Sequence, residues 1–169
     1  MSDHNILAFS DYREAERKFD YFVTGVSGAL FAYLGPLYKP QRIELSPLSL
    51  EPLSLIFFAM AFYFGMKRIQ SVVDVGAENH SLLDHQERSK KATDALKSDA
   101  FEFTTDAGQL VPREQLVLER NESNRLTAET RNNIHKLAEK SYRYYCRRNI
   151  FLYSGFASVL LHKLLIPYV

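Results

Sequence analysis

The side chains that come nearest to a metal site in this sequence are two histidines and two carboxylates. His80 and Asp84 are four residues apart, as are His135 and Glu139, so on helices each pair would share one face. Imidazole and carboxylate groups arranged in this way could bind a divalent metal. The alternative is a solvated face with an ion pair between Asp84 and Arg131, because these residues lie in a polar stretch. We predict no bound metal and no other cofactor.

Catalytic chemistry finds little support. The sequence shows no nucleophile paired with a base and no glycine-rich phosphate loop. The segment RNNIH, from Arg131 to His135, resembles the Arg…His signature of HEPN-type ribonucleases, but it has three intervening residues where that signature usually has more. The lone Cys146 excludes an internal disulfide. It could be acylated beside a membrane, or it could simply be a small apolar interfacial residue. We expect a non-enzymatic protein.

Charged residues are segregated along the chain of 169 residues. Of its 21 basic and 20 acidic residues, 28 lie between Lys67 and Arg148. The two flanks together hold only the other 13, most of them at the edges of apolar segments. This segregation argues against a single water-soluble globule and indicates a small membrane protein with one polar insert. The net charge of +1 argues against nucleic acid as a partner, because nucleic-acid-binding proteins usually carry a basic patch.

Three apolar segments are each long enough to cross a bilayer as a helix. The first, 21–38, carries no charge and contains Pro36 near its end. The second, 47–66, carries only Glu51 near its outer end, and the third, 149–169, has ionisable groups only late in the segment. The alternative for each is the core helix of a soluble protein, but three such helices would need a larger core than this chain provides.

The basic residues beside these segments predict the orientation in the membrane. Nine lie on one side and three on the other: Arg13, Arg17, Lys18, Lys67, Arg68, Lys140, Arg143, Arg147 and Arg148 against Lys39, Arg42 and Lys163. We therefore predict an integral membrane protein, most simply of a bacterial inner membrane. Residues 1–20 would form a cytoplasmic amphipathic N-terminus, residues 67–148 would also be cytoplasmic, and the C-terminus would lie outside.

The polar insert, 67–148, is predicted to be a long antiparallel helical hairpin. Both halves carry apolar residues at helical spacing, and the turn residues Asp106–Gly108 lie at the middle of the insert between two β-prone runs. The fold class is then all-α with three transmembrane helices, of which the second and third continue as a cytoplasmic stalk with a short β-turn element at its tip, 101–111. The apolar stripe of this stalk is thin and lacks a strict heptad, so we expect copies of the chain to cover part of it.

Small residues recur at a spacing of four in the predicted membrane segments, which allows close helix packing in lipid. They are Gly25, Gly28, Ala29, Ala32, Ala61, Gly65, Ser154 and Ser158. Chance is the alternative, since small residues are common in such helices. The middle of each segment lacks the ionisable residues of pumps and proton-coupled transporters. A permeation path would therefore need a ring of protomers, lined by residues such as Thr24, Ser27 or Tyr33.

Two functions remain open. The first is a homo-oligomeric pore-forming or membrane-perturbing effector, gated through its cytoplasmic stalk. Its coarse architecture is similar to that of small helical membrane effectors of bacterial defence systems, such as the two-helix SLATT-type proteins, although no motif here establishes membership. The alternative is a membrane anchor or assembly subunit that recruits a cytoplasmic partner protein through the stalk tip. Apolar residues at an exposed tip are hard to explain without a neighbour: Phe101, Phe103, Leu110 and Val111.

Overall fold

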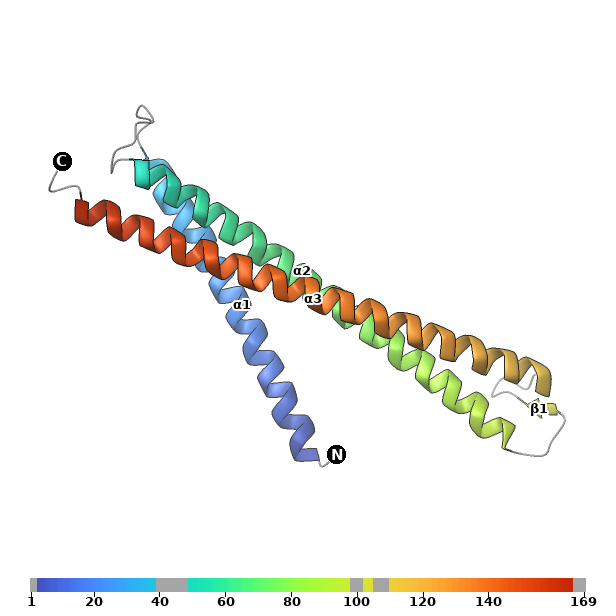
Figure 1. Ribbon diagram of the computed structural model, residues 1–169. Helices are drawn as coiled ribbons and strands as arrows, with labels where there is room; N and C mark the ends of the chain where they lie inside the picture. The colour runs from blue at the N-terminus through green and yellow to red at the C-terminus, as the bar shows by residue number, and fades with distance from the viewer. Residues whose placement is uncertain (1–2, 39–48, 98–101, 105–109, 166–169) are drawn as a thin grey trace. The chain divides into compact units, whose positions relative to one another are not determined.

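A computed structural model describes residues 3–38, 49–97, 102–104 and 110–165 of the chain. Almost all of these residues are helical (Figure 1), in α1 (Asp3–Leu37), α2 (Leu50–Leu96) and α3 (Arg113–Leu165), with the short strands β1 (Glu102–Thr104) and β2 (Leu110–Pro112) between α2 and α3. The expectation of a helical fold is confirmed. Within the described ranges, α2 alone is long and apolar enough to cross a membrane. Crossing by all three helices stays a prediction.

The helices extend beyond the apolar segments from which they were predicted. α1 begins at Asp3 and ends at Leu37, with Pro36 in its last turn, and the Tyr38 N–H still donates to the Leu34 carbonyl at 3.1 Å. α2 runs for 47 residues and α3 for 53. Each has an acidic residue in its first turn, Glu51 in α2 and Glu114 in α3, where a negative charge stabilises the helix dipole.

The two strands form an antiparallel pair near the predicted turn. Glu102 pairs with Pro112, Phe103 with Val111 and Thr104 with Leu110. Pro112 ends β2, and α3 begins one residue later. Pairing with Glu102 holds Pro112 extended, and proline is tolerated at the end of an edge strand because its missing N–H is not needed there. The turn residues themselves, Asp106–Gly108, lie outside the described residues.

The chain divides into two compact units, which we call unit 1 (Met1–Ser71 with Lys140–Val169) and unit 2 (Val72–Glu139). The core of unit 1 is built from all three helices, around Val23, Phe58, Ala61 and Leu152. Phe58 is fully buried and meets the ring of Phe156 edge-on, with centroids 5.4 Å apart. Unit 1 is therefore a three-helix bundle with an aromatic centre.

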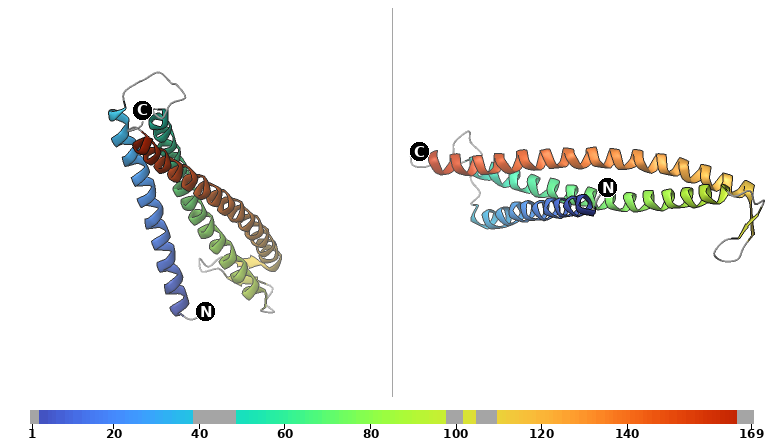
Figure 2. Two further views of the ribbon diagram at one scale, coloured as in Figure 1. Left: turned by 60° about the vertical axis from the view of Figure 1, so that its left-hand side comes forward. Right: turned by 90° about the horizontal axis from the view of Figure 1, so that it is seen from below.

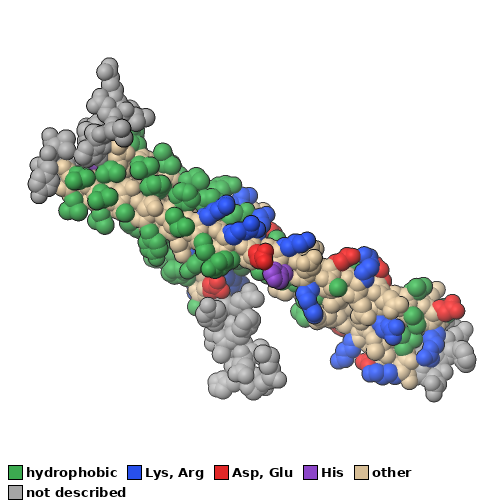
Figure 3. All heavy atoms as spheres, in the orientation of Figure 1, with side chains coloured by type: hydrophobic (Ala, Val, Ile, Leu, Met, Phe, Trp, Pro, Cys, Tyr) green, Lys and Arg blue, Asp and Glu red, His purple; other side chains and the backbone are tan. Residues whose placement is uncertain are grey.

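Unit 1 has a reversed distribution of polar and apolar side chains. Its buried polar or charged residues include Asp20, Thr24, Ser27, Ser54, Arg68, Ser71, Ser141, Arg148, Ser158 and His162. Its exposed large apolar residues include Phe22, Phe31, Tyr33, Ile56, Tyr63, Met66, Ile150, Tyr153, Leu160 and Leu164. Figure 3 shows hydrophobic side chains gathered on one part of the surface and charged ones over the rest. A water-soluble bundle buries its large apolar side chains instead.

In unit 2, stretches of α2 and α3 lie alongside each other and are joined through β1 and β2 (Figure 2). The Ser89 hydroxyl donates a hydrogen bond of 2.6 Å to the Asn124 side chain, linking the two helices. Ala92 and Leu116 are buried, whereas Val73, Leu83 and Leu118 are exposed. Among the residues of unit 2 whose side chains are described, few apolar ones are therefore buried.

Candidate functional site

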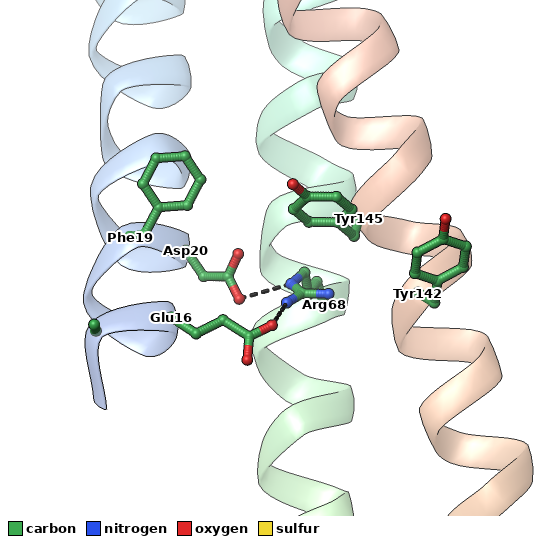
Figure 4. Close-up of a pocket in the computed structure, with 7 residues that line it drawn as sticks. Glu16, Phe19, Asp20, Arg68, Tyr142 and Tyr145 are labelled. Atoms are coloured by element: carbon green, nitrogen blue, oxygen red, sulfur yellow. Dashed lines mark hydrogen bonds and ion pairs between the residues drawn. The ribbon is translucent and has the colours of Figure 1, made fainter. Parts of the chain in front are cut away.

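An ion-paired cluster joins the three helices of unit 1. The Asp20 carboxylate of α1 lies between an arginine of α2 and one of α3: Oδ2 accepts from Nε of Arg68 at 2.6 Å, and Oδ1 accepts from Nη1 of Arg148 at 2.6 Å. One turn earlier in α1, Glu16 Oε1 accepts from Nη2 of Arg68 at 2.7 Å (Figure 4). Two carboxylates of one helix thus hold two arginines of the others. We call these four residues the charge cluster.

The centre of the charge cluster is removed from solvent. The side chain of Arg148 is 0% exposed and that of Asp20 5%, and Arg68 is 8% exposed against 44% for Glu16. Moving an ion from water into a protein interior costs several kcal/mol unless a partner compensates it. Buried Asp20 and partly exposed Glu16 together balance the two guanidinium groups, so the charge cluster as a whole is neutral.

Tyr145 of α3 contacts both arginines through its ring. The guanidinium carbons of Arg68 and Arg148 lie 4.7 and 5.1 Å from the ring centroid, within the range in which a cation is attracted to an aromatic ring. Tyr142 stacks beside it, with centroids 6.4 Å apart. Hydrogen bonding and electrostatic interaction with Cys146 raise the pKa of Tyr142.

A cleft of about 480 Å³ opens beside the charge cluster (Figure 4). It is lined by Ala15, Glu16, Phe19, Asp20, Arg68, Tyr142 and Tyr145. Phe19 is 52% exposed and Tyr142 66%, so the cleft is open to its surroundings. Its buried charges already satisfy one another, and we assign it no catalytic role.

Two buried polar atoms in unit 1 have no hydrogen-bond partner in the part of the chain that is described: Nη2 of Arg148 and Oγ1 of Thr24. Arg148 uses its other nitrogens, with Nε donating to Asn149 at 3.1 Å and Nη1 to Asp20. A buried donor without an acceptor costs about 1–3 kcal/mol. The packing of α1 against α2 and α3 therefore includes an unfavourable contribution that a rearrangement could relieve.

Close helix contacts surround the core of the bundle. A Cβ atom at Gly65 of α2 would collide with the hydroxyl of Thr24 in α1. One at Gly28 would lie 2.9 Å from the Phe62 ring, and one at Gly155 of α3 would lie 2.8 Å from the Phe58 ring.

These contacts involve some of the predicted packing residues and not others. Gly28 and Gly65 lie at close approaches, Ala61 is fully buried, and Ser158 is buried with its hydroxyl donating to the Ser154 carbonyl at 2.9 Å. Gly25 has open space around it, and Ala29 and Ala32 are exposed. Gly155 escaped the sequence pattern because no small residue follows it at a spacing of four.

The histidines considered as metal ligands pair within their own helices. His80 Nδ1 lies 3.5 Å from Asp84 Oδ2 on α2, and His135 Nδ1 lies 3.4 Å from Glu139 Oε1 on α3. Within the described ranges, no three His, Cys, Asp or Glu residues come together as a metal site. The structure thus brings each pair together without joining the two pairs.

The predicted tip is described in part. Phe101 lies outside the described residues, whereas Phe103 and Leu110 lie in the strand pair, opposite Val111 and Thr104 respectively. Val111 is half-buried.

Sequence reasoning missed the charge cluster, because Asp20 was overlooked and Arg68 and Arg148 were taken only as charges beside the membrane segments. The signal was present: each of the three lies within two residues of an apolar segment, at what would be the same end of the bundle. A carboxylate at that level next to two arginines is a candidate ion pair. Comparison with protein-family models, with curated protein sequences and with solved structures gives no match to this chain.

Proposed function

We propose that this chain is an integral membrane protein whose three helices all cross the bilayer, with the N-terminus and residues 67–148 cytoplasmic. The reversed distribution of side chains in unit 1 carries the proposal. Lipid tails accept exposed apolar side chains, whereas polar groups must be satisfied inside the bundle. Accordingly, the hydroxyls of Ser27, Ser54 and Ser158 donate to carbonyls of their own helices.

In this arrangement the charge cluster lies at the cytoplasmic border of the bilayer. Ionisable groups near a membrane are tolerated when they face the bundle interior and pair with one another, as Asp20 does with Arg68 and Arg148. Both arginines belong to the helices that continue into the predicted cytoplasmic hairpin. A change in that hairpin would therefore reach α1 through these ion pairs.

We propose that the protein acts without catalysis, as a homo-oligomer that permeabilises or perturbs the membrane. Thr24 and Ser27 are 3% and 0% exposed inside the bundle, so they line no path in this conformation. A polar path through these hydroxyls requires α1 to move away from α2 and α3. The charge cluster opposes that movement, and its loosening is the proposed gating step.

Dye leakage from liposomes tests this function. The purified full chain is reconstituted, and leakage is compared between the wild type, Asp20→Asn and the control Glu14→Gln. Glu14 lies on the same helix and makes only an exposed ion pair with Lys18. We expect Asp20→Asn to leak faster than both of the others. Liposomes that stay intact with all three proteins at high protein load would rule out the effector function.

The alternative function is a membrane anchor that recruits a cytoplasmic partner through the β1–β2 tip. The strand register favours it, because it pairs Phe103 directly with Val111. Pull-down with Phe103→Ser tests it, with Leu83→Ser as a control because Leu83 is an exposed apolar residue of unit 2 outside the tip. Loss of a partner with Phe103→Ser alone supports the anchor, and an unchanged set of partners opposes it.

A further inference from the structure

We infer that unit 1 binds the phosphate headgroups of anionic phospholipids through a surface that we call the basic face. The basic face consists of Lys67 on α2 and of Lys140, Arg143 and Arg147 on α3. The inference rests on the proposed membrane location and adds the chemical class of lipid that the protein selects.

Helix geometry and one aromatic contact bring these four side chains together. Lys140, Arg143 and Arg147 are exposed, and spacings of three and four place them on one side of α3. The guanidinium carbon of Arg147 lies 5.6 Å from the centroid of the Phe64 ring on α2. Lys67 is three residues beyond Phe64, so it lies on the same side of α2. The two helices therefore present their basic residues side by side.

The positive charge of the basic face is not neutralised by nearby carboxylates. The carboxylates of unit 1 whose side chains are described have other neighbours: Glu14 pairs with Lys18, Glu16 and Asp20 with the two buried arginines, and Glu51 lies 4.0 Å from His162. Lys67 makes one contact with an uncharged acceptor, at 3.4 Å from Gln70. Glu139, which precedes Lys140 on α3, contacts His135 at 3.4 Å. Among the residues whose side chains are described, none of the four charges of the basic face is therefore paired with a carboxylate.

The surroundings of the basic face favour a lipid over a free anion. Phe64 stacks on Phe151, with centroids 5.5 Å apart, and lies 6.2 Å from Tyr144. Toward the predicted bilayer the surface continues into exposed apolar residues such as Met66 and Ile150. Figure 3 shows Lys and Arg side chains gathered where the hydrophobic surface ends. Arginine and lysine bind phosphate oxygens, and the acyl chains of the same molecule would lie on the apolar surface.

Binding of fluorescent lipids to the detergent-solubilised full chain tests the inference. Phosphatidylglycerol is compared with phosphatidylcholine, each carrying the same acyl-chain fluorophore, by polarisation. A basic residue near an anionic membrane surface contributes roughly fivefold to affinity. We expect the wild type to prefer phosphatidylglycerol at least tenfold. The triple variant Lys67→Gln, Arg143→Gln, Arg147→Gln should lose that preference.

The matched control is Lys90→Gln, Arg131→Gln, Lys136→Gln, which removes three exposed charges from unit 2 and should keep the lipid preference. If the triple variant does not fold, Arg143→Gln alone should weaken phosphatidylglycerol binding roughly fivefold. Arg147→Lys keeps the charge and should bind nearly as well as the wild type.

Several outcomes overturn the inference. Equal affinity for the two lipids does so, as does a preference that the triple variant retains. Competition experiments identify another occupant. If excess inorganic phosphate or a short RNA displaces phosphatidylglycerol as effectively as unlabelled lipid does, the basic face binds that competitor and the inference is wrong. Binding is measured in micelles and leakage in liposomes. If the liposomes stay intact but the protein still prefers phosphatidylglycerol, only the effector function is refuted. If the liposomes leak but the protein shows no lipid preference, only the binding of lipid by the basic face is refuted.

Discussion

Asp20 and Arg148 are 128 positions apart in the sequence, and their side chains meet at 2.6 Å inside unit 1. This contact joins the first helix to the last, and Arg68 of α2 binds the other carboxylate oxygen of Asp20. One carboxylate therefore compensates buried positive charge on two helices at once. Without the Asp20 carboxylate, the two guanidinium groups would lose the charge that lies between them.

The first prediction follows from that arrangement. Asp20→Asn keeps the shape of the side chain and removes its charge, which leaves Arg148 buried without an ionic partner. Removing one member of a buried ion pair typically costs about 3–5 kcal/mol of unfolding free energy. Unfolding of the full chain in mixed micelles, followed by circular dichroism, measures the change.

Glu14→Gln is the control for this prediction, because its ion pair with Lys18 is exposed and such pairs contribute little. The double variant Asp20→Asn, Arg148→Met removes both charges and should recover part of the lost stability. An Asp20→Asn protein as stable as the wild type would show that the charge cluster does not hold α1 in place.

The helical class and the approximate positions of the three helices could be predicted, because apolar runs of sufficient length and helical spacing are local patterns. The charge cluster could not be predicted from such local patterns. It depends on which faces of α1, α2 and α3 meet, and several charged residues flank each apolar segment. Only the packing selects Asp20, Arg68 and Arg148 from the neighbouring Lys18, Lys67 and Arg147.

The packing glycines show the same limit of local patterns. Gly25 and Gly28 both follow the small-residue spacing, but only Gly28 lies against another helix. Gly155 lies against Phe58 without belonging to any such pair. A spacing rule identifies residues that permit close approach, whereas the choice among them depends on how each helix is rotated in the bundle.

The second prediction compares two glycine substitutions. In Gly155→Ala the new methyl group would lie 2.8 Å from the ring of Phe58, which is fully buried and cannot turn aside. Overpacking of this kind typically costs about 1–3 kcal/mol. Gly25→Ala meets open space and should stabilise the helix by up to about 1 kcal/mol. Thermal unfolding in detergent compares the two, and equal effects would show that Phe58 does not pack there.

The third prediction concerns the ion pairs of unit 2. Arg125 bonds to Glu122 and Glu129, and its hydrogen bond, followed by its charge, lowers the pKa of Glu122. Arg125→Gln should therefore raise the pKa of Glu122 toward its ordinary value of 4.5, as read by carbon NMR of the carboxyl group.

The lowered pKa of Glu122 also determines how the stability of the folded chain depends on pH. Because the pKa of Glu122 is lower in the folded chain, its stabilising contribution is present above the ordinary value of 4.5 and is lost as pH falls through the folded value. Arg125→Gln should lose less stability than the wild type on acidification. Lys136→Gln, also on an exposed part of unit 2, serves as the control. An unchanged Glu122 titration in Arg125→Gln would contradict the ion pair.

The fourth prediction tests whether α1 must move for the membrane to leak. A Cβ atom at residue 65 would lie 3.1 Å from Cβ of Thr24. This is closer than the roughly 3.5–4.5 Å found across disulfides, so a shift of a few tenths of an ångström between α1 and α2 brings the two Cβ atoms to bonding separation. Thr24→Cys with Gly65→Cys, made with Cys146→Ser so that no other thiol competes, should therefore form a disulfide between α1 and α2.

The oxidised form of this variant keeps α1 on α2 and should leak less dye than the same protein after reduction. Cys146→Ser alone separates the effect of the reductant from that of the crosslink, since it should leak equally with and without reductant. Combining the crosslink with Asp20→Asn sharpens the test: if the charge cluster acts by holding α1, the disulfide should suppress the additional leakage of Asp20→Asn. If leakage is the same with and without the crosslink, the membrane is perturbed without separation of α1 from α2. The buried positions Thr24 and Ser27 would then not line the path.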